Sequence, residues 1–246
     1  MNFKFKFFQL FPQLFSRLFK SLYRHKLDYN LAGLIKSGMC LDIIYDIGAH
    51  KAKWSKNMSL KSLNNKEFIL FEANKTNEKY LKDTSFKYFI EVLSDEKKKI
   101  KFYSKKLPGD SYYKEQSDRY NEGNAETRNA VTLDEVIEKE KIPLPNLIKI
   151  DTQGSEIDIL KGAKKSLTNC NLIYLETPII EYNSGSPNLN QCIDYLKSID
   201  FIPYDICEVH YMDKILIQID ILYVRKDIFY KFFPGKSSIN YLGRLI

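Results

Sequence analysis

A short turn at the end of an apolar run carries residue types that suit a cofactor site. In Asp46-Ile47-Gly48-Ala49-His50 the small residues let the backbone turn close to a ligand at the carboxyl end of a strand. A dinucleotide would need the pattern Gly-x-Gly-x-x-Gly, with its pyrophosphate on the next helix N-terminus. Only one of these glycines is present, and Asp46 would repel a phosphate. The pattern favours a cationic cofactor without phosphate, such as S-adenosylmethionine, and an ordinary strand–turn–helix connection is the competing interpretation.

Two further strand ends extend this cofactor site. Glu72, followed by Ala73, ends the next apolar run, about two dozen residues after Asp46. An acidic side chain at this place can accept both ribose hydroxyls of an adenosine cofactor. The alternative is that Glu72 only caps the following helix, but its spacing from Asp46 favours the cofactor. Ser94 and Asp95 end a third run, where an adenine amino group would lie.

Transfer of a methyl group from such a cofactor needs an acceptor atom behind the methyl carbon, and a hydroxyl acceptor would also need a group that accepts its proton. Asp151, Glu176 and His210 lie at three predicted strand ends or turns, and Glu156 can reach the same space as a substrate contact. We expect His210 to be the general base, because imidazole titrates near neutral pH. A surface histidine is the alternative. Asp151 either orients the acceptor or the methionine end of the cofactor, or caps the next helix.

Clustered carboxylates can also hold a hard divalent cation, and Asp151, Glu156 and Glu176 are candidates. No compact motif demands a metal, so we expect none. Asp220 fits a structural hydrogen-bond acceptor and a site residue equally well. The four cysteines form no Cys-x-x-Cys pair, which argues against a zinc site and a disulfide framework and fits a reducing cytoplasm.

The elements that position these residues alternate between strand and helix. The predicted strands are 42–47, 68–72, 88–93, 147–151 and 172–176, all short apolar runs typical of strands buried on both faces. Thr132 to Glu135 forms a capping box, and Ser155 opens a second helix that we expect to run to about Thr168. This alternation predicts a parallel sheet with right-handed crossovers.

The chain changes character near its end. The apolar runs 201–209 and 215–224 are separated by only five residues, which permits an antiparallel hairpin and no crossover. A parallel sheet that ends in a hairpin distinguishes this α/β fold from plain dinucleotide dehydrogenases, which usually continue the parallel winding. Residues 105–130 show no periodicity, and we expect a functional loop there.

Three zones are expected: an N-terminal helical extension (1–37), the α/β domain (38–230) and a tail (231–246). The extension places five apolar side chains on one helical face and basic residues elsewhere. Such a helix either covers an edge of the fold or lies on a membrane surface. We expect a cytoplasmic protein, with peripheral contact at the inner membrane face as the second interpretation. The apolar face comprises Leu14, Phe15, Leu18, Phe19 and Leu22.

Segments spread over residues 42–227 resemble the FkbM family of methyltransferases in order and content. The most specific is the block from Lys149 to Glu156, of the form Lys-Ile-Asp-x-x-Gly-x-Glu. The resemblance implies a class I fold that binds S-adenosylmethionine and methylates oxygen on sugars or polyketide-like molecules. The other matching segments are Asp46–Ala49, Phe71–Ala73, Leu93–Asp95, Thr132–Asp134, Lys161–Ala163, Leu175–Glu176, Tyr204–Ile206, Glu208–His210 and Asp220–Arg225.

The same resemblance adds a substrate loop and shows two departures. Gly109 to Tyr112 is similar to a serine-containing loop of the family, so Ser111 and Tyr112 are expected to contact substrate; the aromatic faces of Tyr112, Tyr113 and Tyr120 could stack on a sugar. Where relatives have Asn and then a second Gly, this chain has His50 and Ala52. His50 either replaces the hydrogen bond of Asn or alters the cofactor loop.

The sequence therefore predicts an O-methyltransferase that acts on a sugar hydroxyl, in the synthesis of a bacterial cell-surface glycan. Methylation of a polyketide-like metabolite and a non-catalytic binding module are the alternatives. The formal charge of +7 permits nucleic-acid binding, but the lysines are scattered and no basic stripe or recognition module is visible. We expect no nucleic-acid partner.

Overall fold

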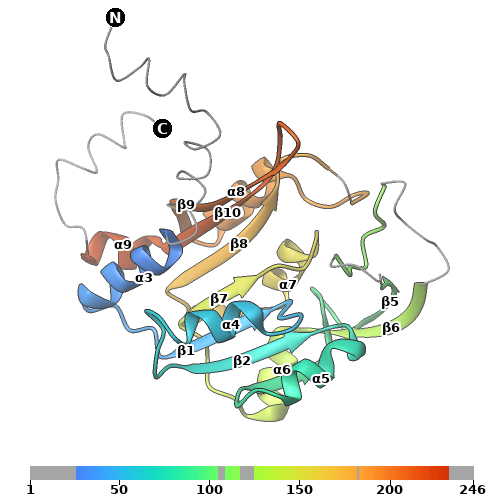
Figure 1. The fold of residues 1–246 in the computed structure, drawn as a ribbon, viewed down its shortest axis with the longest axis horizontal. Coiled ribbons are helices and arrows are strands. Elements are labelled where there is room, and N and C mark those ends of the chain that lie inside the picture. Colours follow the sequence, from blue (N-terminus) through green and yellow to red (C-terminus); the bar gives the residue numbers. More distant parts are fainter. Residues whose placement is uncertain (1–25, 105–108, 117–124, 182, 233–246) are drawn as a thin grey trace, which may run out of the picture.

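The computed structural model describes residues 26–104, 109–116, 125–181 and 183–232. Its centre is a seven-stranded sheet of order β3-β2-β1-β7-β8-β10-β9 (Figure 1). All pairs are parallel except those of β10, which runs antiparallel to both β8 and β9. The predicted parallel sheet with a terminal hairpin is confirmed. The strands are β1 (Ile43–Ile47), β2 (Glu67–Glu72), β3 (Lys87–Ile90), β7 (Leu147–Ile150), β8 (Leu172–Pro178), β9 (Phe201–Met212) and β10 (Ile215–Arg225).

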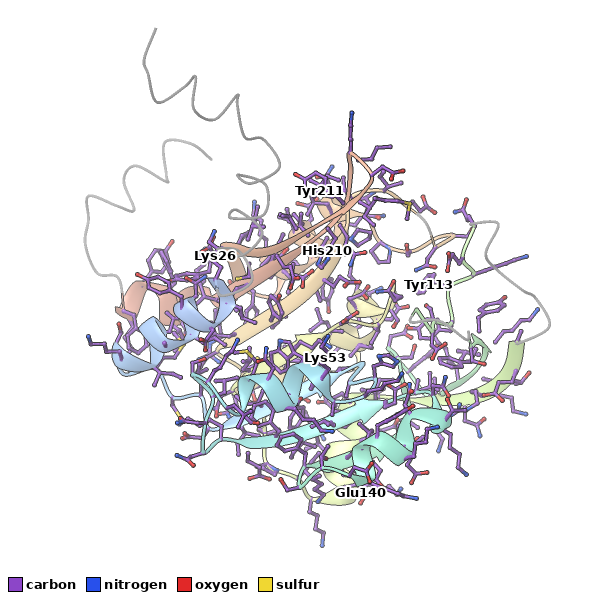
Figure 2. All side chains as sticks on the ribbon, viewed as in Figure 1. Lys26, Lys53, Tyr113, Glu140, His210 and Tyr211 are labelled. Carbon is purple, nitrogen blue, oxygen red and sulfur yellow. The ribbon has the colours of Figure 1, made fainter. Side chains whose placement is uncertain are left out.

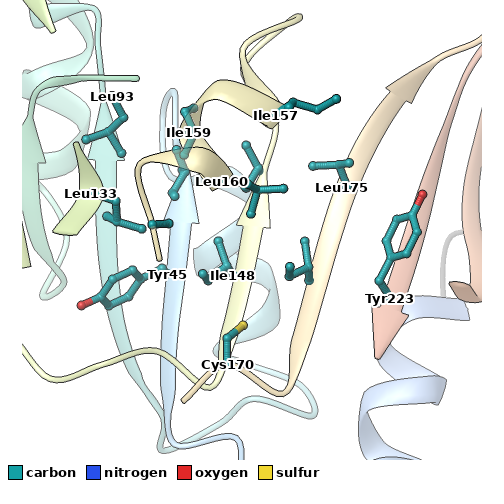
Figure 3. Packing of buried hydrophobic residues seen from close by; sticks show 14 of the residues in the cluster. Tyr45, Leu93, Leu133, Ile148, Ile157, Ile159, Leu160, Cys170, Leu175 and Tyr223 are labelled. Carbon is teal, nitrogen blue, oxygen red and sulfur yellow. The ribbon is translucent and has the colours of Figure 1, made fainter. Parts of the chain in front are cut away.

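Helices cover both faces of this sheet, because its central strands are apolar on both sides. Alternate residues of β1 enter different cores: Tyr45 and Ile47 face one, and Ile44 faces the other. The helices that pack into the first core (Figure 3) are α6 (Leu133–Glu140), α7 (Glu156–Lys161) and α8 (Leu189–Ser198). The helices that pack into the second core are α3 (Lys26–Lys36), α4 (Lys53–Met58), α5 (Glu78–Lys82) and α9 (Lys226–Phe232). The result is a three-layer α/β fold.

The predicted third strand, 88–93, is wrong as a single strand. Register with β2 ends where Ile90 pairs with Glu72, and the chain then leaves the main sheet. Val92 and Leu93 form β4, which pairs with β6 (Ala125–Val131) in a small sheet of order β4-β6-β5, completed by β5 (Lys98–Tyr103). The loop predicted over 105–130 therefore ends in a strand. The sequence shows no apolar pattern from which to predict β6, because Ala130 is the one buried residue of this strand.

The capping box of α6 is confirmed: Thr132 and Glu135 exchange side-chain to backbone hydrogen bonds. The long helix expected from Ser155 to Thr168 is wrong. It breaks after Lys161 into α7 and a short 3-10 helix, η3 (Ser166–Thr168). Gly162 marks the break, because it packs so tightly on β4's end that a Cβ atom would lie 2.2 Å from the Ser94 carbonyl oxygen.

Only the end of the predicted N-terminal extension is described. Helix α3 packs Leu27, Leu31 and Leu34 into the second core, against the outer strand β9. The apolar face predicted for residues 14–22 and the tail after residue 232 lie outside the described residues. No helix in the described ranges is both long and apolar enough to cross a lipid bilayer.

Candidate active site

A cavity of about 280 Å³ opens at the carboxyl ends of β1, β2, β7 and β8. Four residues at or next to these strand ends line it, namely Gly48, Glu72, Asp151 and Glu176, and Ser111 lines it from the segment between β5 and β6. This is the edge where open α/β sheets bind ligands. Figure 2 shows His210 on the β9–β10 hairpin and Tyr113 on the segment after β5, both on the upper side, with Glu140 at the opposite end of the molecule.

The lining of this cavity is acidic. Five of its residues carry carboxylates: Glu72, Glu91, Asp110, Asp151 and Glu176. Among the described residues no lysine or arginine lines it. An acidic cavity favours a positively charged ligand and disfavours a pyrophosphate.

The turn after β1 forms the cavity floor. Gly48 has φ +75°, and a Cβ atom there would lie 1.9 Å from the Asp151 carbonyl oxygen, so only glycine fits. The backbone N–H groups of Gly48 and Ala49 donate to the Phe71 carbonyl oxygen at 3.0 and 3.1 Å. His50 and Ala52 also have positive φ, of 50° and 56°. His50 lines the cavity, and burial, with Lys51 nearby, lowers its pKa. Ala49, by contrast, does not line it.

Asp46 lies behind this floor and does not line the cavity. It is fully buried, with its oxygens 3.0 Å from Lys149 Nζ and 2.5 Å from the Ser55 hydroxyl that donates to it. Lys149 also donates to the Gly48 carbonyl oxygen (3.2 Å) and lies 3.4 Å from Asp151. Burial lowers the pKa of Lys149, but Asp46 and Asp151 outweigh this effect and raise it above its ordinary value. Lys149 thus ties the ends of β1 and β7 together.

Glu72 faces the cavity and is held by the chain itself. Its carboxylate accepts backbone N–H bonds from His50 (2.6 Å) and Asn74 (2.7 Å). Burial raises the pKa of Glu72, while these N–H groups act in the opposite direction. The Asn77 side chain is a third hydrogen-bond partner of this carboxylate. Two carboxylate oxygens offer about four acceptor positions, so the group can still accept a ligand hydroxyl. Ala73 lines the cavity beside it.

The polar pair predicted near the adenine does not line the cavity. Ser94 is fully buried and donates to Asp95 (2.9 Å), and Asp95 pairs with Lys98 (2.5 Å). Apolar side chains line this end instead, and sequence reasoning missed them because they look like ordinary core residues. They are Phe71, Val92, Leu93, Phe102 and Ile159.

Residues 109–112, between β5 and β6, form another part of the cavity lining. The Ser111 hydroxyl donates to the Gln153 carbonyl oxygen (2.9 Å). The hydroxyls of Tyr112 and Tyr113 both donate to Asp158, at 3.1 and 2.8 Å, and the two rings stack 5.1 Å apart. Ser111 and Tyr112 line the cavity, but their hydroxyls are already bound to α7 and the turn before it. Tyr120 lies outside the described residues.

Glu156 is also turned away from the cavity. It is 1% exposed, and one of its oxygens accepts the N–H groups of Thr152 (3.2 Å) and Gly154 (3.0 Å). It therefore shapes the turn between β7 and α7 and does not line the site.

The remaining candidates meet at the β8 end of the cavity. Gln153 bridges Asp151 and Glu176 with its side-chain amide. Burial and the carboxylates of Asp151 and Asp220 raise the pKa of Glu176 well above its ordinary value. His210 does not line the cavity, but its ring and the carboxylates of Glu176 and Asp220 offer atoms within 4.8 Å of one another. Such a group could bind a proton or a cation.

Comparison with known proteins relates this chain to a methyltransferase family. The sequence model described as the Methyltransferase FkbM domain matches residues 46–203, more than half of the chain. A hexuronic acid methyltransferase of Haloferax volcanii is 34% identical over 50 residues, which are 20% of this chain and 21% of that protein. The match thus spans about a fifth of that curated relative.

The solved structures to which this chain is similar include two methyltransferases, both with TM-scores under 0.5. The FkbM methyltransferase of Methylobacillus flagellatus KT is 16% identical with a TM-score of 0.49, over 74% of this chain and 43% of that one. The magnesium protoporphyrin IX methyltransferase of Synechocystis PCC 6803, solved with bound S-adenosylmethionine, is 8% identical with a TM-score of 0.46, over 82% and 79% of the two chains.

Proposed function

The chain belongs to the FkbM family of methyltransferases, whose methyl donor is S-adenosylmethionine. We propose that it transfers the methyl group to a hydroxyl oxygen of a sugar, in the synthesis of a bacterial cell-surface glycan. One observation carries the proposal: an acidic cavity ends beside an imidazole that is held by a carboxylate. The partial similarity to a hexuronic acid methyltransferase supports a sugar as acceptor.

The residues present fit this cofactor. S-adenosylmethionine supplies a methyl group on a positively charged sulfur. The five lining carboxylates offset positive charge, and Gly48, which packs against the Asp151 backbone, presents its own backbone to the cavity. Glu72 is placed to accept ribose hydroxyls. The apolar group around Val92 and Phe102 suits an adenine ring.

Beyond the cofactor, the residues at the end of β8 would hold the acceptor. Asp151 and Glu176, linked by Gln153, can accept hydrogen bonds from sugar hydroxyls and fix the reacting oxygen in line with the methyl carbon. Such positioning contributes up to about 7–11 kcal/mol to lowering a barrier. His210, which is about one third exposed, takes the hydroxyl proton. A positioned base contributes about 10²–10⁴-fold.

The test is transfer of a trideuteromethyl group from labelled S-adenosylmethionine to an acceptor panel, followed by mass spectrometry. Hexuronic acids, neutral hexoses and short oligosaccharides form the sugar set; a polyketide-type alcohol and an amine form the comparison set. We expect labelled sugar, with His210→Gln reduced about a hundredfold and Asp213→Asn, on the exposed hairpin turn, unchanged. Labelling only of the comparison set rejects the sugar assignment, and the absence of transfer to any acceptor rejects the enzyme.

A further inference from the structure

We propose that Asp220 is a positioning residue that fixes the tautomer and orientation of His210, so that Nδ1 of the imidazole accepts the proton. This inference rests on the proposed function, because it identifies which ring nitrogen of His210 accepts the proton when His210 acts as the general base. It concerns residues of the terminal hairpin, outside the cofactor loops.

The strand register places the two side chains together. On β9 and β10, His210 pairs with Gln218 and Glu208 pairs with Asp220. Residues two apart on a strand share a face, so His210 and Asp220 are diagonal neighbours on one face of the sheet. On the other side, Asp220 pairs with Glu176 of β8, which lines the cavity. The hairpin therefore brings the imidazole to the acceptor end of the site.

The hydrogen bonds around Asp220 determine which nitrogen of His210 carries the proton. Asp220 is 8% exposed, and one carboxylate oxygen accepts the buried Tyr174 hydroxyl at 2.8 Å. The other oxygen lies 3.1 Å from His210 Nε2. An ionised carboxylate can only accept hydrogen bonds, so Nε2 must be the donor. In the neutral ring Nδ1 is then the basic nitrogen, and it has no hydrogen-bond partner among the described residues.

The charges that face His210 set the pH at which it works. Asp220 and Glu208 lie on the hairpin, Glu176 on β8 and Asp151 after β7, all acidic. The hydrogen bond with Asp220 raises the pKa of His210, and burial acts in the opposite direction. Because the base must be neutral, the rate rises with pH through this raised pKa. Replacing Asp220 by Asn removes the charge that favours the imidazolium, so the rise moves to lower pH.

The kinetic experiment compares Asp220→Asn with Asp213→Asn, which removes the same charge from the exposed turn of the hairpin. We expect Asp220→Asn to lower kcat about a hundredfold and to move the rising limb to lower pH, with KM for S-adenosylmethionine unchanged. Asp213→Asn should match the wild type. A wild-type rate and pH profile for Asp220→Asn overturns the positioning role alone. Lack of methyl transfer by the wild type would instead refute the proposed function.

A second measurement does not depend on turnover and observes the tautomer in the wild-type protein itself. The chain has three histidines, so ¹⁵N spectra of the wild-type imidazoles can be assigned with His210→Gln and His50→Gln. We expect the Nε2–H tautomer for His210. The Nδ1–H tautomer overturns the inference. Selective broadening of the His210 signals by stoichiometric Mn²⁺ also overturns it, because Glu176, His210 and Asp220 would then form a cation site.

Discussion

Replacing Gly48 by Ala tests whether the turn after β1 is built for close backbone packing. Gly185→Ala is the matched control. The two glycines have nearly the same φ, +75° and +76°, but a Cβ at position 185 meets nothing within 4 Å. At position 48 it would lie 1.9 Å from the Asp151 carbonyl oxygen and 2.8 Å from the carbonyl carbon.

The difference between the two variants isolates the steric contribution. Both place an L side chain in the left-handed region, which costs about 1–2 kcal/mol. Gly48→Ala must also separate the turn from the backbone at Asp151, and overpacking of this kind costs typically 1–3 kcal/mol more. For a chain of this size 1 kcal/mol corresponds to about 2–4 °C in Tm. Gly48→Ala should therefore melt several degrees below Gly185→Ala.

The assay is calorimetric melting of both variants, followed by titration with S-adenosylhomocysteine below the lower Tm. We expect Gly185→Ala to bind like the wild type and Gly48→Ala to lose at least about tenfold in affinity, equivalent to 1.4 kcal/mol. Equal melting temperatures and equal affinities for the two variants would refute the argument that the turn needs a missing side chain.

Three further sets of variants test other parts of the structure. Lys149→Met should lower the free energy of unfolding, measured with urea, by about 3–5 kcal/mol, because it leaves Asp46 buried without a cation. The double variant that also carries Asp46→Asn should recover part of this loss. No recovery would contradict the pairing of Lys149 with Asp46. His50→Asn should keep the affinity for S-adenosylhomocysteine, since Asn adopts positive φ readily, whereas His50→Ala should lose about two- to tenfold, the value of one hydrogen bond. If both bind equally, His50 makes no such bond. Gly33 lies on the exposed side of α3, and a Cβ atom there would meet nothing within 4 Å. Gly33→Ala should therefore stabilise the protein by about 0.5–1 kcal/mol. A lower Tm would show that the helix is not the stable element described.

The sequence was sufficient for most of the central sheet, but it merged β3 with β4 of the small sheet. Strands β1, β2, β7 and β8 were predicted to within two residues at either end, because strands buried on both faces are nearly continuous apolar runs. The terminal hairpin followed from a connector too short for a crossover. The small second sheet was missed, because β6 buries only Ala130 and so has no apolar periodicity.

The sequence could not decide which way an acidic side chain points. Asp46 and Glu72 both end strands, yet Asp46 turns inward to Lys149 and Glu72 faces the cavity. The partner that draws Asp46 inward lies about a hundred residues away, on a neighbouring strand. A charged residue within the apolar run 147–150 was the one available signal. Asp220, within the apolar run of β10, gave a similar signal for the pair with His210.

The central claim is that the acidic cavity takes a positively charged methyl donor. Calorimetric titration of the wild-type protein with S-adenosylmethionine, with NAD in a parallel titration, tests it most directly. We expect one molecule of S-adenosylmethionine to bind per chain, with affinity reduced in Glu72→Ala, and no heat from NAD. Binding of NAD, or no binding of S-adenosylmethionine at millimolar concentration, would contradict the account.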